Sequence, residues 1–415
     1  MDTRSIRKQT REAIAGVLRR LPISSRLLGP PKGWYALTDE WFQRGSPAAR
    51  ASRRWEIYPP LSSTRNTAPR SLGATVPWQF LTYYGGMQVE DPPGWIAEIP
   101  DGRVVDNGTV ITPDDYMLAD VSRQFLVGTQ ARHSVNRRCH LGTLEKLPGR
   151  LAVLAVANTT YWHWFFDLLP RIVLIREHYG TLDDIDGFIV NPLNTPYQHQ
   201  TLEMLGVPTS KIIERTRNGK FHVQADRLIV PSVTVEVPPR WACLQLRELL
   251  TADQPPPSGG KRIYISRADA RLRNVENEGE VLSLLAEHGF EPVQLTGMSI
   301  SEQRDIFSSA EFVVAPHGAG LTNLVFSRPG TTVLELFPPI YVNPCYWALS
   351  DHLGLNYYYL LGDGETPPPP PPGVHHDEWF TSFVRRDSSL QAIRIDIQGL
   401  RALLEEALGA GTKQG

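Results

Sequence analysis

Residues 311–323 constrain the fold of this 415-residue chain more than any other segment. An apolar run ends at His317, and Gly318 and Gly320 follow before a second apolar run begins. A strand that ends in glycines and passes into a helix is how α/β proteins bring backbone N–H groups close to a phosphate. The segment therefore predicts a parallel α/β domain with an anion-binding turn.

The composition is that of a globular protein with room for two domains. Apolar residues make up 41% of the chain, charged residues make up 21%, and the net charge is −2. A chain so nearly neutral gives no reason to expect a nucleic-acid partner. Its three cysteines are odd in number and far apart, which predicts free thiols and a cytoplasmic location. No apolar run reaches the ~18 residues of a spanning helix, so we expect none.

The N-terminal segment is basic. Residues 1–32 contain eight arginines and lysines against two acids, and apolar residues recur at helical spacing between positions 6 and 21. One interpretation is a helix that contacts an anionic membrane surface through residues 1–28, on the inner face of the cell membrane. The other is a solvated helix or arm, and the sequence leaves both open.

The pattern of strands, helices and breaks divides the chain into four segments. Residues 1–75 are predicted to be the basic helix and an irregular lead-in, and residues 76–253 an N-terminal α/β domain with short extra strands. A Pro/Gly linker at 254–260 leads to a second α/β domain at 261–365, and residues 366–415 form a proline-rich loop and a helix. Two such units in tandem predict two facing Rossmann-like domains with a cleft between them.

The expected elements follow from apolar periodicity. The expected strands are 151–156, 187–190, 211–213, 227–230, 262–265, 291–295, 312–315 and 332–336. The expected helices are 162–179, 196–205, 278–288, 300–309, 319–326 and 400–408. Because parallel strands end at the same edge of a sheet, polar residues that follow the strands of the second domain should meet there.

Arg267, Arg273 and Asn274 follow the first strand of the second domain. Arginine offers forked N–H donors that match phosphate oxygens, and this position puts the pair on the same edge as His317. We therefore predict that these residues and the turn His317–Gly320, which includes Gly318 and Ala319, form a phosphate site. The alternatives are a solvated loop for the arginines and a loop-tying side chain for His317.

Glu335 stands inside an apolar strand, where an unpaired carboxylate is costly to bury. Near the carboxyl end of a parallel strand it would face a bound ligand, and a ribose diol is its natural partner. The alternative is a structural ion pair with a nearby arginine.

His163 and Asp167 are four residues apart near the start of a predicted helix, so they share one face. A carboxylate can hold an imidazole in the tautomer that a general base needs. The alternative is an aromatic core stripe with a capping histidine. Asp184 with Asp186, and the stretch 375–377, have metal-like composition but are predicted loops, so no metal site is expected.

Three motifs together resemble glycosyltransferase family 61 over about residues 151–340. They are Tyr161-Trp-His163-x-x-x-Asp167-x-x-Pro170-Arg171, Ile265-Ser-Arg267 with Arg273-Asn274, and Pro316-His-Gly-Ala-Gly-Leu-Thr-Asn323 with Glu335-Leu-Phe-Pro338. The rest of the chain carries no matching motif.

The resemblance implies a GT-B fold and inverting transfer of a sugar to a glycan hydroxyl. The donor would be a nucleotide sugar, expected to be UDP-linked, with no further cofactor and no metal. The setting would be bacterial surface or capsular polysaccharide synthesis. The donor would lie against Arg267, Arg273, Asn274, His317, Gly318, Ala319, Gly320, Asn323 and Glu335. The acceptor would lie near His163 and Asp167, either of which could be the base.

Three rival functions stay open from the sequence. One is a non-catalytic nucleotide- or sugar-binding protein, the second is a scaffold of a polysaccharide assembly complex, and the third is a pyruvyl-type transferase on a similar fold. A screen of donors and acceptors separates them.

Overall fold

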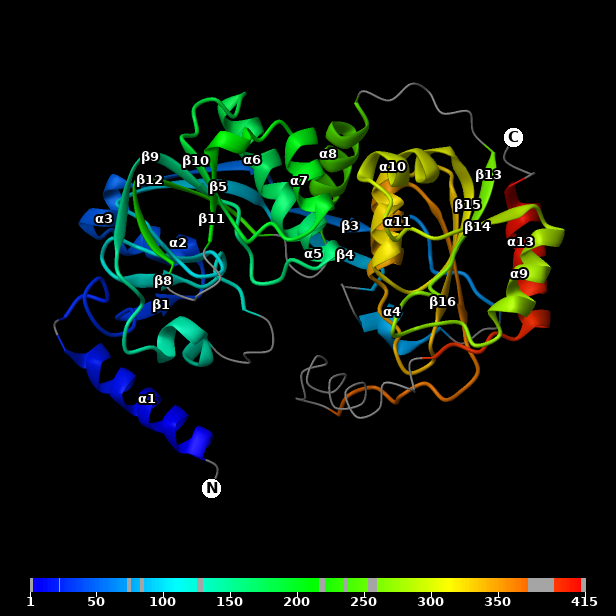
Figure 1. Ribbon diagram of the computed structural model, residues 1–415, viewed down its shortest axis with the longest axis horizontal. Coiled ribbons are helices and arrows are strands. Elements are labelled where there is room, and N and C mark those ends of the chain that lie inside the picture. Colours follow the sequence, from blue (N-terminus) through cyan, green and yellow to red (C-terminus); the bar gives the residue numbers. More distant parts are fainter. Residues whose placement is uncertain are drawn as a thin grey trace. The chain divides into compact units, whose positions relative to one another are not determined.

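The computed structural model describes residues 3–21, 23–72, 76–82, 86–124, 130–215, 221–233, 238–252, 260–371 and 392–411 (Figure 1). The chain forms two compact units. Unit 1 comprises Met1–Pro60 and Pro92–Val235, and unit 2 comprises Leu61–Asp91 and Glu236–Gly415. Of the predicted linker 254–260 only the last residue is described, and the stretch 375–377 lies outside the described residues.

Unit 1 is a mixed α/β unit. Its strands are β1 (Gly33–Tyr35), β2 (Arg53–Tyr58), β5 (Gly94–Pro100), β6 (Arg103–Val105), β7 (Thr109–Ile111), β8 (Tyr116–Leu118), β9 (Glu145–Val153), β10 (Gly187–Val190), β11 (Ile212–Glu214) and β12 (His222–Pro231). Its helices are α1 (Thr3–Arg20), α2 (Thr38–Arg44), α3 (Pro47–Ala51), η2 (Gln130–Arg132), η3 (Ser134–Arg137), α5 (Tyr161–His163), η4 (Trp164–Leu168), α6 (Leu169–Tyr179), α7 (Pro196–Met204) and η5 (Thr209–Lys211).

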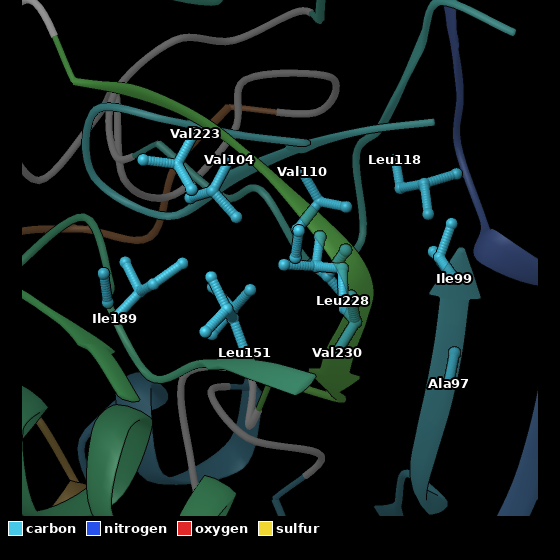
Figure 2. Close-up of a cluster of buried hydrophobic side chains, with 14 of the residues drawn as sticks. Ala97, Ile99, Val104, Val110, Leu118, Leu151, Ile189, Val223, Leu228 and Val230 are labelled. Carbon is cyan, nitrogen blue, oxygen red and sulfur yellow. The ribbon is translucent and has the colours of Figure 1, made fainter. Parts of the chain in front are cut away.

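These strands form one sheet in the order β1, β8, β7, β6, β12, β9, β10, β11, and β5 joins it through β12 and β2 through β5. The stretch from β12 to β11 is parallel, whereas β5 and β6 pair antiparallel with β12. Buried aliphatic side chains of the sheet pack together as its core (Figure 2). Burial of this apolar surface is the main force that stabilises the unit.

Unit 2 contains a five-stranded parallel sheet and a two-stranded hairpin. Its strands are β3 (Leu61–Thr64), β4 (Gln88–Asp91), β13 (Lys261–Ile265), β14 (Phe290–Val293), β15 (Ala310–Pro316), β16 (Thr332–Phe337) and β17 (Asn356–Leu361). Its helices are α4 (Trp78–Thr82), α8 (Arg240–Thr251), α9 (Glu278–Glu287), α10 (Ile300–Ser309), η6 (Ala319–Phe326), α11 (Cys345–Leu353) and α13 (Ile397–Gly411).

The five parallel strands lie in the order β14, β13, β15, β16, β17. Helices α9 and α13 cover one face of this sheet, and α10 and α11 cover the other (Figure 1). The segment Leu61–Asp91, far from β13 in the sequence, also packs into this unit. Phe80 of α4 is buried against Trp347 and Tyr359, with ring centroids 5.6 and 4.7 Å away.

The predicted mixed α/β class with parallel strands is confirmed. The capping box that begins α10 is present, with Ser299 Oγ accepting from the Glu302 N–H at 3.2 Å. Two helical stretches differ from expectation in type: η6 is a 3-10 helix, and η4 is a single π turn inside the predicted helix 162–179.

The prediction of irregular structure between residues 33 and 75 was wrong. This stretch contains β1, α2, α3, β2 and β3. Their partners are distant in sequence, since β2 pairs with β5 and β3 pairs with β4, and local periodicity cannot show such pairings. Among the described helices, none has both the length and the apolar character that a membrane crossing needs.

Candidate functional site

In unit 2, two loops leave the sheet where its strand order reverses. The chain runs β13, β14, β15, but β13 lies between the other two in space. The loop after β13 carries Arg267 and Arg273, and the turn after β15 carries His317 and Gly318. Open parallel sheets bind ligands beyond the carboxyl ends of their strands at such a reversal, so the fold brings the predicted residues to the expected place.

Arg267 packs directly on Gly318. A Cβ atom at position 318 would overlap the Arg267 guanidinium, so only glycine allows this approach. Arg267 Nη2 donates to the Leu272 carbonyl at 3.1 Å. Burial, and then the charge of Arg273, lower the pKa of Arg267, and the charge of Asp269 opposes that decrease.

Arg273 has a left-handed backbone, with φ of 61°, which is uncommon for a residue other than glycine. Its guanidinium lies 4.9 Å from the ring centroid of Tyr341, a cation–π contact. A strained residue held by its surroundings is typical of functional sites.

Three polar atoms at this edge are buried and lack a hydrogen-bond partner among the described residues: Arg267 Nε, Arg273 Nε and Asn274 Oδ1. An unpaired buried polar group costs about 1–3 kcal/mol, so such groups are rare unless something binds to them. Two donors and one acceptor match the oxygens of an anion and a neighbouring hydroxyl.

His317 and Glu335 form a buried pair behind the arginines. The side chains are 6% and 0% exposed, and Nδ1 of His317 is hydrogen-bonded to Oε1 of Glu335. The Tyr357 hydroxyl donates to Oε2 of Glu335 at 2.6 Å. Both carboxyl oxygens are therefore satisfied inside the fold.

Burial sets the protonation of this pair. Burial lowers the pKa of His317 well below its usual value, and the charges of Arg273 and Arg267 add to that effect. Burial raises the pKa of Glu335 well above its usual value, and Tyr357 and Arg273 oppose that rise only in part. The imidazole ring stacks on Phe337 with centroids 5.1 Å apart, so its orientation is also fixed by packing.

Two predicted donor residues have other surroundings than expected. Glu335 is fully buried, and each of its oxygens already has a hydrogen-bond partner, Nδ1 of His317 and the Tyr357 hydroxyl. Asn323 is fully buried and donates through Nδ2 to Gln303 Oε1 at 2.7 Å, which ties η6 to α10. Of the remaining predicted residues in the turn, Ala319 is exposed and Gly320 is half-buried.

In unit 1, His163 and Asp167 are hydrogen-bonded, with Nδ1 and Oδ2 2.8 Å apart, and their side chains are 22% and 13% exposed. The π turn η4 lies between them, and such turns occur often at functional sites. Trp164 of the same turn is buried and donates to Thr201 Oγ1 at 2.8 Å. The aromatic stripe is thus part of the core, while the pair itself remains accessible.

Arg171, which is part of the same sequence motif, is a structural residue. It is 2% exposed, and Nη1 donates to the carbonyls of Val153 and Ala155, each at 3.1 Å. Burial lowers the pKa of Arg171 to about 10. The residue holds the end of β9 to α6.

Asp184 and Asp186 lie in a loop, as the sequence predicted. Asp186 Oδ2 accepts from the Arg150 N–H at 2.7 Å, and the loop precedes β10. Among the described residues, no group of three or more His, Cys, Asp or Glu side chains is arranged to hold a metal ion.

Sequence reasoning missed Tyr357 and Tyr341. Both lie beyond the last predicted strand, in a stretch where aromatic residues are ordinary core candidates. Tyr357 could have been identified as a tyrosine on the strand that pairs with the strand of the buried Glu335. That identification requires knowing that β16 and β17 are neighbours.

Unit 2 is thus an α/β unit with a five-stranded parallel sheet that carries two arginines and a glycine turn at its strand reversal, the edge where such sheets bind ligands. Residues 161–334 match the family described as Glycosyltransferase 61, and this segment contains both the His163–Asp167 pair and the arginine-glycine edge. Over these residues, the resemblance to this family that the sequence motifs indicate is confirmed.

A relative in rice, Oryza sativa subsp. japonica, is the beta-1,2-xylosyltransferase RCN11. It is 38% identical over 61 residues, which cover 15% of this chain and 11% of the rice protein.

Proposed function

We propose that this protein is an inverting glycosyltransferase that moves a sugar from a nucleotide sugar to a glycan hydroxyl. The family match and the name of the rice relative support the transfer of a sugar. The observation that carries the donor assignment is the pair of buried Nε–H groups of Arg267 and Arg273 without a described partner, with Arg267 packed on Gly318 at the strand reversal of unit 2.

In this proposal the donor diphosphate lies against Arg267 and Arg273. Charge that builds on the leaving diphosphate is stabilised by these fixed donors, as in an oxyanion hole. Asn274, with an unpaired Oδ1, takes over the role of acceptor for a ribose hydroxyl that the sequence had suggested for Glu335.

The acceptor hydroxyl needs a base, and the His163–Asp167 pair is our candidate. The Asp167 carboxylate orients the imidazole through Nδ1, as a carboxylate does for a histidine that acts as a general base. The GT-B arrangement, in which donor and acceptor are held by different Rossmann-like domains, is part of this proposal, as are a UDP-linked donor and metal-independent transfer. The setting we propose is surface or capsular polysaccharide synthesis in a bacterial cytoplasm.

A donor screen tests the proposal. Nucleotides and UDP-, GDP- and CMP-sugars are compared by thermal shift, since a ligand at 100 times its dissociation constant adds about 2.7 kcal/mol of stability. Release of the nucleotide only when a glycan acceptor is present supports a transferase. If nucleotide sugars bind but no nucleotide is released with any donor and acceptor, the protein is a binding protein or a scaffold instead. If the group transferred is a pyruvyl group, the protein is a pyruvyl-type transferase.

A further inference from the structure

We propose that His317 presents an Nε2–H donor to the bound anion, and that Glu335 and Tyr357 are positioning residues that hold it in this state. The proposal rests on the proposed function for the identity of the anion, a nucleoside diphosphate. The protonation of His317 is a property of the protein without ligand.

The first step is the geometry of the three side chains. The Tyr357 hydroxyl donates to Oε2 of Glu335, so this oxygen acts as an acceptor. Oε1 of Glu335 and Nδ1 of His317 are in hydrogen-bond contact, so one proton lies between them. Among the described residues, Nε2 of His317 has no hydrogen-bond partner, and it is the remaining polar atom of the ring.

The second step is a count of protons. Glu335 is fully buried, and in the described part of the chain no arginine or lysine is paired with it. A buried pair of this kind is most stable with no net charge. A net-neutral pair holds two protons, one between Oε1 and Nδ1 and one on Nε2. This holds whether the shared proton resides on oxygen or on nitrogen.

The surrounding titratable groups agree with this state. Arg267 and Arg273 face the ring from the loop after β13, and their positive charges disfavour a further charge on it. Tyr341 and Tyr346 lie beside it, with ring centroids 5.2 and 5.3 Å away. Burial raises the pKa of both tyrosines and of Cys345, the third group on this side, so all three remain neutral.

The consequence is a division of roles. Arg267 Nε, Arg273 Nε and His317 Nε2 all offer hydrogens at one edge of the sheet. Such a set binds the oxygens of an anion and cannot remove a proton from an acceptor. His317 is therefore assigned to the leaving group and excluded as the base.

The protonation is measured directly by NMR on protein labelled with ¹⁵N-histidine. We expect the His317 Nε2 to be protonated at pH 7 and to remain so between pH 5 and 8. The control is Glu278→Gln, a carboxylate in the same unit that accepts from Tyr264 at 2.9 Å and should not alter the His317 signals. An Nε2 without a proton at pH 7 overturns the proposal.

The positioning role is measured by the affinity for UDP, by calorimetry. Glu335→Ala should weaken binding at least about tenfold, because the support of His317 is lost. In Glu335→Gln the amide can donate to Nδ1 while its carbonyl accepts from Tyr357, so we expect most of the affinity to return. If Gln binds as weakly as Ala, the carboxylate itself contacts the ligand and the positioning role is wrong.

The NMR measurement and the UDP calorimetry test the inference and the proposed function separately. If no nucleotide binds the wild-type protein, the proposed function fails while the NMR result still decides the state of His317. If UDP binds tightly but Nε2 is bare, the proposed function stands and this inference fails.

A second inference rests on a different observation in unit 1. Helix α1 exposes Ile14 and Val17 to 46% and 61%, and Leu21 and Leu27, which follow the helix, are 41% and 75% exposed. Ile14 and Val17 lie on one face of the helix, since they are three residues apart. The opposite side packs on η3, where Arg19 Nη2 donates to the backbone carbonyl of Asn136 at 2.5 Å.

We infer that this apolar face docks on an anionic lipid surface. Residues 1–32 carry eight basic side chains against two acids, and one of these acids, Glu12, is already paired with Arg137. An amphipathic helix with such an excess of positive charge favours the headgroup region of an anionic bilayer. The alternative occupant of this face is an acidic protein surface, and the vesicle experiment distinguishes the two.

Flotation with phosphatidylglycerol-containing vesicles tests this docking. We expect binding that is lost at least about tenfold in a Val17→Asp, Leu27→Asp double variant, and about fivefold in Arg20→Gln. Leu81→Asp, at an equally exposed leucine of unit 2 (61%), is the matched control and should bind normally. Equal binding to neutral phosphatidylcholine vesicles, or a monomer produced from a dimer by the double variant, overturns the inference.

Discussion

The two histidine–carboxylate pairs differ in what surrounds them. His163 and Asp167 are one helical turn apart and remain 22% and 13% exposed, whereas His317 and Glu335 come from neighbouring strands and are almost completely buried. An exposed pair can exchange protons with water and substrate. A buried pair keeps the protons it has, so we propose proton transfer for the pair in unit 1 and fixed hydrogen-bond donation for the pair in unit 2.

The largest effect is expected at the exposed pair. His163→Ala and Asp167→Asn should each lower the rate of sugar transfer by about 10²–10⁴-fold, because the proton acceptor or its orientation is lost. UDP affinity should not change. Single-turnover transfer and calorimetry measure the two quantities, and Asp184→Asn, in a loop of the same unit, is the control. Near-normal transfer by both variants would remove the base from this unit.

A large effect on stability is expected close to that pair. Arg171→Met leaves the carbonyls of Val153 and Ala155 without their donor, which should reduce the free energy of unfolding by about 2–5 kcal/mol. Urea denaturation measures it, with exposed Arg53→Met as control. A loss below about 0.5 kcal/mol would show that the motif arginine is not structural.

Beside the buried His317–Glu335 pair, the predicted phosphate site is tested by a change at Arg267. Arg267→Ala removes a charged donor and should weaken UDP binding by about 10–150-fold, which corresponds to about 1.5–3 kcal/mol. Arg271→Ala, at an exposed position of the same loop, should have little effect. Binding by Arg267→Ala as tight as wild type, measured by calorimetry, would refute the phosphate assignment.

The last prediction concerns another buried histidine, His222 of unit 1, which contacts Arg103 at 3.2 Å. Burial lowers its pKa from 6.5 to about 4, so between these pH values the unfolded chain binds more protons than the folded one. Its contribution to stability is complete above pH 6.5. It should then fall by at most about 1.4 kcal/mol per pH unit as the pH drops towards 4.

His133 and His352 are also buried with lowered pKa values, so they act in the same direction. The measurement is therefore the difference in urea denaturation between wild type and His222→Gln at pH 7 and pH 4.5. Parallel pH dependence in the two proteins would show that His222 stays protonated or solvated in the fold.

Much of the second unit could be predicted from the sequence. Each strand of the parallel sheet up to β16 is a short apolar run, and the residues after the strands meet at one edge because parallel strands share their direction. The role of Glu335 could not be predicted, because it depends on Tyr357 from a strand that carries no polar signal of its own. In unit 1, β1 and β2 depend on distant partners and were missed for that reason.

Connectivity has a consequence for any attempt to produce the parts separately. Leu61–Asp91 belongs to unit 2 although the chain then returns to unit 1, so the backbone passes between the units three times. A C-terminal fragment from residue 236 would lack Phe80 and leave Trp347 and Tyr359 without their packing partner. A fragment that begins at residue 236 should therefore be insoluble, whereas a rearranged gene that joins residues 61–91 to residues 236–415 should yield a soluble unit 2.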